Sequence, residues 1–197
     1  RTGSFSGGGG EEALLGAASA QITNYYGLIS SVGAGMTDSK LPDAQSGFEK
    51  GISVAMAALA GCNGISESSG MLASLMGCSY ESLVIDNEML GVIMRTVKGI
   101  EVSDETLSLE VIKEAVFGDG HFLRSGQTLE KMKSEYFYPE ILDRKSQLEW
   151  REDGSLDIRK RAEIKVKQIL ENHSPLYIDK KADSLIRQNF PIQIDFS

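Results

Sequence analysis

A polar turn between an expected strand and an expected helix holds the first residues able to do chemistry. Residues 28–45 read LISSVGAGMTDSKLPDAQ, where a run of small and β-branched residues leads into Asp38 and Lys40. In α/β folds the turn after a strand is where catalytic groups are placed, and a lysine amine there forms Schiff bases with carbonyl substrates. The alternative is an ordinary turn whose Asp38 and Lys40 are only solvated.

Two further stretches hold candidate functional residues. Residues 61–65, GCNGI, are expected to form a second short strand that opens into the polar turn SESSG, so that Asn63 and Glu67 lie at its end. His121 stands in GDGHFL, where the flanking glycines let the backbone approach another group closely. A histidine that caps or packs is the alternative at that position.

The remaining motifs do not match a phosphate or metal site. The glycine run at residues 7–10 lacks the lysine of a phosphate-binding loop, and the glutamates that follow it would repel a phosphate. GAGMTD at residues 33–38 lacks the final glycine of a dinucleotide fingerprint, so tight turns explain both stretches. Cys62, Cys78, His121 and His173 match no zinc-ligand spacing, and we expect no metal and free thiols in a reducing cytoplasm.

The elements that would position these residues alternate between helices and strands. We expect helices over residues 12–26, 42–60 and 80–98, and strands over residues 28–33 and 61–65. The spacing of about 30 residues is typical of parallel strands joined by crossover helices. The apolar face of the second helix is expected to hold Phe48, Ile52, Ala55, Met56 and Leu59.

Two strands cannot form a stable α/β domain, and an eight-stranded barrel needs about 250 residues. We therefore predict that residues 1–100 are the closing βα units of a TIM (β/α)8 barrel. Residues 101–197 are expected to form a helical C-terminal extension, with helices over 103–115, 128–135, 156–172 and 180–188. Residues 136–151 are expected to be irregular, and no strand is expected before the extreme C-terminus.

The composition describes a globular chain, with 41% hydrophobic and 24% charged residues. Its net charge of −8 argues against broad nucleic-acid binding and favours a small-molecule or protein partner. No apolar run is long enough to span a membrane. The chain opens with Arg1 and has no initiator Met, so we expect a piece of a longer protein. Apolar surface left exposed where the missing strands belong would favour association, and we expect a homo-oligomer.

Five stretches in sequence order together resemble one family. They are SGGGGEEALL, TDSKLPDAQ within the first turn, SYESLVIDNEMLG, GIEVSDETL and GDGHFL, and the resemblance extends from Ser6 to about Leu142. As a set they are similar to the C-terminal portion of the trimethylamine methyltransferase family, corrinoid-dependent enzymes that include the glycine-betaine methyltransferases. The resemblance implies a TIM barrel, in agreement with the βα pattern.

The resemblance also implies an activity and a partner. Members of the family move a methyl group from a methylated or quaternary amine to the Co(I) of a separate corrinoid protein, whose cobalt is the nucleophile. The barrel protein then needs neither a nucleophilic side chain nor a metal, but must hold and align the amine and shield it from water. The lack of conventional triads and metal clusters agrees with such a mechanism.

A cationic substrate implies carboxylate and amide groups at the carboxyl ends of strands. We therefore expect Asp38, Lys40 and His121 as catalytic residues and Gly33, Met36, Asn63 and Glu67 as substrate-binding residues. Some members carry pyrrolysine, whose equivalent position is expected near residues 36–40. This chain has only the standard twenty residues, so either the member lacks pyrrolysine and acts on a quaternary amine such as a betaine, or that residue lies outside this sequence.

Two other hypotheses remain open at this point. The first is a Schiff-base TIM-barrel lyase or aldolase that uses the amine of Lys40. The second is a non-catalytic chain that acts only as an assembly module.

Overall fold

The computed structural model describes residues 5–173 and 177–192. The chain divides into two compact units, residues 1–166 and 167–197, and the candidate site lies within the first. Every described strand lies before residue 79, and the described elements after residue 100 are helices. A domain boundary between residues 100 and 101 stays a prediction.

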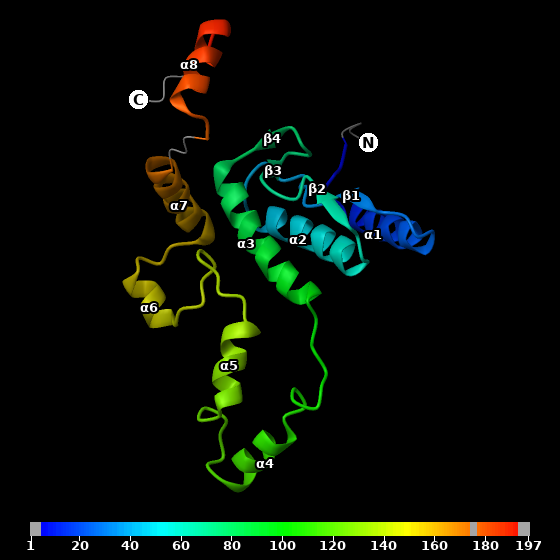
Figure 1. Ribbon diagram of the computed structural model, residues 1–197, viewed down its shortest axis with the longest axis vertical. Helices are drawn as coiled ribbons and strands as arrows, with labels where there is room; N and C mark the ends of the chain where they lie inside the picture. The colour runs from blue at the N-terminus through cyan, green and yellow to red at the C-terminus, as the bar shows by residue number, and fades with distance from the viewer. Residues whose placement is uncertain (1–4, 174–176, 193–197) are drawn as a thin grey trace. The chain divides into compact units, whose positions relative to one another are not determined.

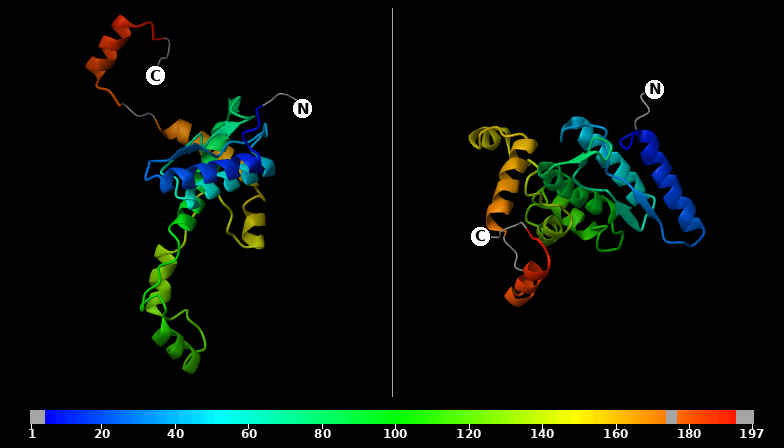
Figure 2. Two further views of the ribbon diagram at one scale, coloured as in Figure 1. Left: turned by 90° about the vertical axis from the view of Figure 1, so that its right-hand side faces the viewer. Right: turned by 90° about the horizontal axis from the view of Figure 1, so that it is seen from above.

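A parallel strand pair with a crossover helix forms the centre of the first unit (Figure 1). β1 (Ser31–Gly33) pairs in parallel with β2 (Gly64–Ser66), in a register that sets the first residues of the two strands opposite each other. α2 (Ala44–Leu59) connects them, and α1 (Gly10–Tyr25) packs against α2 and β1. Figure 2 shows α1 and α2 side by side in its right-hand view. The expected order and direction of the strands are therefore confirmed, in a mixed fold that is mostly helical.

Side-chain caps explain where the two central helices begin. Asp43 accepts a hydrogen bond from the backbone N–H of Ser46 (3.0 Å) at the start of α2. Ser79 accepts one from Ser82 (3.0 Å) at the start of α3 (Tyr80–Val97), which packs on α2. Each cap satisfies a donor that the first turn leaves free, so both helices begin within a turn of the expected residue.

A short antiparallel hairpin follows β2, and no sequence pattern predicts it. β3 (Met71–Leu72) pairs with β4 (Gly77–Cys78). Three consecutive residues of its turn, Ala73, Ser74 and Leu75, have positive φ angles of 51°, 54° and 71°. Strands of two residues are too short to show an alternating pattern, and positive φ is uncommon for residues other than glycine.

The region after α3 is helical, as expected, but one helix begins later than predicted and one further helix was not predicted. Its described helices are α4 (Leu109–Phe117), α5 (Gly126–Ser134), α6 (Gln147–Glu152), α7 (Ile158–Asn172) and α8 (Lys180–Asn189). The start expected near residue 103 is wrong, because Ser108 has φ 56° and α4 begins only after it. The segment of α6 was expected to be irregular, but it forms a helix that begins with a capping box between Ser146 and Glu149. The extreme C-terminus, residues 193–197, lies outside the described residues.

The core of the first unit is built from small side chains. Ala34, Val54, Ala57 and Ile93 form its buried cluster. The apolar face predicted for α2 is wrong for Phe48, Ile52 and Leu59, which are 65%, 48% and 63% exposed, whereas Ala55 packs against the core. The residues that α2 buries instead are Ser46, Glu49, Lys50, Ser53, Val54 and Ala57. None of the described helices combines the length and the apolar character that a bilayer crossing requires.

Candidate functional site

The carboxyl ends of β1 and β2 bring three of the predicted site residues together. Gly33 ends β1, and a Cβ placed on it would lie 2.7 Å from Oε2 of Glu67 and 3.5 Å from Cε of Met36. Glu67 directly follows β2 and has φ 54°. Its exposed carboxylate accepts a hydrogen bond from the Ser66 hydroxyl (2.7 Å). The bare backbone of Gly33 therefore leaves the space that the Glu67 carboxylate occupies.

The loops that follow the two strands are pressed together at a second glycine. Gly35 has φ 91°, and a Cβ on it would lie 2.7 Å from Cα of Ser68 and 2.9 Å from its carbonyl oxygen. The N–H of Gly35 donates to the Ser53 hydroxyl on α2 (3.0 Å), and the N–H of Ala34 donates to the carbonyl of Ser66 (3.1 Å). The residues on both sides of Glu67 are thus held against the loop after β1.

Asp38 lies farther along the loop after β1, and both of its carboxylate oxygens are engaged. Oδ2 accepts a hydrogen bond from the Ser6 hydroxyl (2.5 Å), and Oδ1 accepts from the Ser74 hydroxyl (2.5 Å) and the Gly7 N–H (3.1 Å). Burial acts to raise the pKa of Asp38, but the hydrogen bonds from Ser6, Ser74, Gly7 and Gly8 together outweigh it and lower that pKa. The ionised carboxylate joins the N-terminal glycine segment to the β3–β4 hairpin.

A second carboxylate, that of Glu49 on α2, supports the same loop from inside. Its Oε2 accepts hydrogen bonds from the Thr37 hydroxyl (2.5 Å) and the Asp38 N–H (2.9 Å), and its Oε1 accepts from Gln45 (2.9 Å). A Cβ on Gly8 would lie 2.7 Å from the backbone nitrogen of Asp38. Gly7, whose added Cβ would lie 3.1 Å from Sδ of Met36, and Gly8 therefore pack closely against this loop.

The strand ends form an acidic region. Lys40 is exposed and its ammonium donates to the backbone carbonyl of Asp38 (2.8 Å). The acidic side chains at the strand ends are those of Asp38 and Glu67, with Glu49 beneath the loop of Asp38. The first turn of α1 carries Glu11 and Glu12. Burial raises the pKa of Glu12, whose Oε2 has no hydrogen-bond partner among the described residues. This balance of charge favours a cationic ligand.

Asn63 does not lie where it was expected. β2 begins at Gly64, so Asn63 precedes the strand and lies at its amino end, whereas Glu67 lies at its carboxyl end. The Asn63 amide oxygen accepts hydrogen bonds from the N–H (3.0 Å) and the hydroxyl (3.2 Å) of Ser30, which precedes β1. Asn63 thus connects the two strands at their amino ends, away from Glu67 at the carboxyl end of β2. The predicted position was wrong because the strand starts three residues later than expected.

His121 is not brought to the strand ends either. It is exposed in the turn between α4 and α5 and lines a pocket of about 310 Å³ with neighbours from that same region. The lining of that pocket runs from Val111 to Ser125 and includes no residue of β1, β2 or the loops that follow them. The structure therefore groups Gly33, Met36, Asp38 and Lys40 with Glu67, and leaves His121 outside this group.

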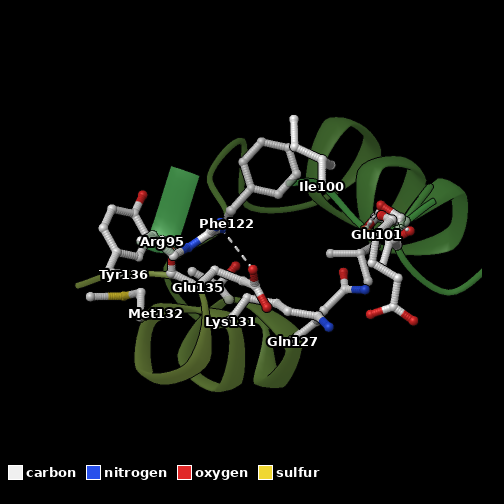
Figure 3. A pocket seen from close by; sticks show the side chains of 13 residues that line it. Arg95, Ile100, Glu101, Phe122, Gln127, Lys131, Met132, Glu135 and Tyr136 are labelled. Carbon is white, nitrogen blue, oxygen red and sulfur yellow. Dashed lines mark hydrogen bonds and ion pairs between the residues drawn. The ribbon is translucent and has the colours of Figure 1, made fainter. Parts of the chain in front are cut away.

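A larger pocket, of about 490 Å³, lies between the end of α3, the segment after it and α5 (Figure 3). Phe122, Met132 and Tyr136 supply apolar walls, and Arg95 forms an ion pair with Glu135 across it (2.8 Å). Its other charged lining residues are Glu101 and Lys131. A cationic amine would meet two basic side chains here, and the Glu135 carboxylate is already bound by Arg95 and Lys98. The strand ends suit a cation better.

The most buried charged residues of the site region were not predicted from the sequence. Lys50 on α2 is fully buried and forms an ion pair with Asp86 on α3 (2.6 Å), and Glu49 beside it is 9% exposed. Adjacent charged residues in a helix indicate a solvated face, so pattern alone points away from them. A signal was available in Ser46, Glu49, Lys50 and Ser53, whose helical spacing makes a continuous polar stripe opposite the large apolar residues.

The two cysteines are free thiols, as expected. Cys62 is half-buried and Cys78 is exposed. Within residues 5–173 and 177–192, no three His, Cys, Asp or Glu side chains come close enough to hold a metal ion.

Comparison with known proteins decides the family. A family profile described as trimethylamine methyltransferase matches residues 1–191. The chain belongs to the trimethylamine methyltransferase family. The resemblance seen in the sequence is thereby confirmed, and homologues of the chain are methyltransferases.

Individual relatives carry two different substrate names. The chain is 35% identical over 187 residues to a glycine betaine methyltransferase of Desulfitobacterium hafniense (strain Y51), an alignment that covers 95% of this chain and 39% of that protein. It is 39% identical over 175 residues to the trimethylamine methyltransferase MttB of Methanosarcina thermophila, covering 87% of this chain and 35% of the relative. The chain thus spans little more than a third of the length of these relatives.

Proposed function

We propose that the chain is part of a methyltransferase that moves a methyl group from a methylated or quaternary amine to the Co(I) of a cognate corrinoid protein. The amine is of the trimethylamine or glycine-betaine kind, since relatives of both names match the chain. The corrinoid is carried by the partner protein and is the methyl acceptor, so it enters as a second substrate.

The observation that carries the proposal is the exposed Glu67 carboxylate at the carboxyl ends of two parallel strands. Asp38 has both oxygens engaged by Ser6, Gly7 and Ser74, so its charge contributes to the local field more than to direct contact. Glu67 accepts a hydrogen bond from the Ser66 hydroxyl and is exposed, so within the described part of the chain its carboxylate is open to a ligand. A carboxylate at the carboxyl ends of the strands attracts an ammonium group, and ligands of α/β folds bind at these strand ends.

The reaction needs alignment more than side-chain chemistry. One C–N bond of the amine breaks, its electron pair stays on nitrogen, and the methyl carbon takes up the electron pair that Co(I) supplies. Glu67 would hold the cationic nitrogen so that one methyl group faces the partner, and buried Met36 would line the floor beside Gly33. A quaternary amine becomes neutral at nitrogen when it loses its methyl group, so its attraction to Glu67 falls and release follows.

The proposal extends to the fold and the assembly. The βαβ unit formed by β1, α2 and β2 is proposed as one of the closing units of a TIM (β/α)8 barrel, followed by a helical extension. Exposed apolar side chains such as Ile29 (89%) support association with further chain or with a second copy. We propose a homo-oligomer that works in the cytoplasm, where Cys62 and Cys78 stay reduced.

The two other hypotheses have less support. A Schiff-base lysine is activated by an apolar pocket or a neighbouring cation, whereas Lys40 is exposed and donates to the carbonyl of Asp38. A purely assembling chain would have no use for a carboxylate kept open at the strand ends.

A screen of methylated amines tests the proposal. The full-length protein is mixed with reduced corrinoid protein and with trimethylamine, glycine betaine or carnitine, and the absorbance change from Co(I) to methyl-Co(III) is followed. Glu67→Gln should raise the KM for the amine about tenfold to a hundredfold, the equivalent of ~1.5–3 kcal/mol for a charge-assisted contact. The KM for the corrinoid protein should stay unchanged.

Glu130→Gln, a like substitution at an exposed position on α5, is the matched control and should behave as the wild type. Absence of turnover with every amine would remove the substrate class. Equal KM values in Glu67→Gln and wild type would remove Glu67 from the amine site.

A further inference from the structure

A fully buried ion pair lies behind the loop that carries Glu67. The Lys50 ammonium on α2 lies 2.6 Å from Oδ2 of Asp86 and 2.7 Å from the Ser82 hydroxyl, both on α3. The two charged side chains are 0% and 4% exposed. The amine of Lys50 is therefore shut off from solvent and has no part in binding a ligand at the surface.

The same carboxylate oxygen of Asp86 also holds the end of the loop after β2. The N–H of Gly70 donates to Oδ2 of Asp86 (2.7 Å), and the carbonyl of Gly70 accepts from the N–H of Ser79 (3.2 Å). Gly70 has φ 82°, and a Cβ on it would lie 2.7 Å from Cδ2 of Leu83. Backbone and side-chain contacts thus fix Gly70 on α3, three residues after Glu67.

The other end of this loop is fixed on the loop after β1. The carbonyl of Ser66 accepts from the N–H of Ala34, and the backbone of Ser68 lies against Gly35. Glu67 stands between these two anchors with a positive φ. A hydrogen bond that restrains Gly70 therefore also restrains the backbone of Glu67, and with it the direction of the Glu67 carboxylate.

We propose that Asp86, neutralised by Lys50, is a positioning residue that fixes the loop of residues 66–70 and thereby aims Glu67 at the amine. An ionised carboxylate accepts a backbone N–H more strongly than a neutral group does, and Lys50 supplies the charge that makes such a carboxylate tolerable in the interior. The inference deepens the proposed function and rests on it.

Two double variants of the full-length protein separate positioning from stability. Lys50→Met with Asp86→Leu removes the pair and the acceptor of the Gly70 N–H, and leaves no buried charge. Lys50→Met with Asp86→Asn also removes the pair, but keeps an amide oxygen that accepts that N–H. Because neither variant buries an unpaired charge, both are expected to fold.

The expected result is a difference between the two variants in amine binding. The variant with Leu should raise the KM for the methylated amine about tenfold, the loss of one buried hydrogen bond, with the KM for the corrinoid protein unchanged. The variant with Asn should restore the KM to within about threefold of wild type. Amide hydrogen exchange of residues 66–70 should be faster in the first variant only.

Equal KM values in the two variants would overturn the proposal and leave the pair a purely structural one. Should neither variant fold, exchange in the wild type decides: a loop fixed by Asp86 is protected without amine, and fast exchange there would refute the inference. If the wild type turns over no amine, the proposed function fails, while the exchange comparison still shows whether Asp86 fixes the loop. The two failures are therefore distinguishable.

Discussion

The two loops meet at Gly35 so closely that an added methyl group should destabilise the protein. In Gly35→Ala, the new residue would be held at φ 91°, and its Cβ would lie 2.7 Å from Cα and 3.0 Å from the carbonyl carbon of Ser68. A left-handed conformation costs an alanine about 1–2 kcal/mol, and an overpacked methyl group adds about 1–3 kcal/mol. We expect the free energy of unfolding to fall by about 3 kcal/mol, since backbone cannot move aside as a flexible side chain does.

Thermal unfolding followed by far-ultraviolet circular dichroism measures this change. For a chain of this size the loss corresponds to a fall in Tm of about 6–12 °C. Gly47→Ala is the matched control, because Gly47 lies within α2 and a Cβ on it meets nothing within 4 Å. That change should raise stability by about 0.5–1 kcal/mol. A Gly35→Ala protein as stable as the control would refute the reasoning that this glycine is required by close approach.

Two further substitutions test the polar loop. Asp38→Asn should destabilise the protein at neutral pH and flatten the acid side of its stability profile. The lowered pKa of Asp38 means that its contribution is complete above the ordinary value of 3.8 and is lost as the pH falls through the lower folded value, which urea unfolding from neutral to acid pH measures. Lys40→Met should leave amine turnover unchanged, because the Lys40 ammonium donates to the backbone carbonyl of Asp38 and a cationic amine gains nothing from a like charge. Borohydride should trap no carbonyl substrate on the wild type, and trapping at Lys40 would restore the lyase hypothesis.

The βαβ unit was predictable because its signals are local. Small and β-branched residues followed by a polar turn and a proline mark β1 and the start of α2, and Asp43 caps the helix. The repeat of this pattern places Glu67 after the second strand. The same reliance on local signals explains why the position of Asn63 was predicted wrongly. GCNGI looks like one continuous strand, and only the pairing of Gly64 with Ser31 shows where the strand begins.

The buried face of α2 was not predictable from hydrophobic spacing. Large apolar residues mark one side of the helix, yet the side that packs inward carries Glu49, Lys50 and Ser53. Each of these has a partner outside the helix: Lys50 pairs with Asp86, Glu49 accepts from Thr37, and Ser53 accepts from the N–H of Gly35. Such partners appear only in three dimensions, so a helix that buries a polar side and exposes its large apolar residues is predicted from its sequence to do the opposite.

The exposed apolar side of α2 indicates that the strand pair has a further neighbour on this side. Phe48 and Leu59 are more than half exposed, as is Leu14 on α1, and surfaces of this kind mark contact sites in proteins. In the described part of the chain β1 pairs with β2 alone, so each strand has an open edge that natural sheets cover or pair. This chain aligns with only 39% and 35% of two of its relatives, and the proposed barrel would need further chain for both purposes. The polar face of α2 positions the site, and the apolar face is the one expected to meet the rest of the proposed barrel.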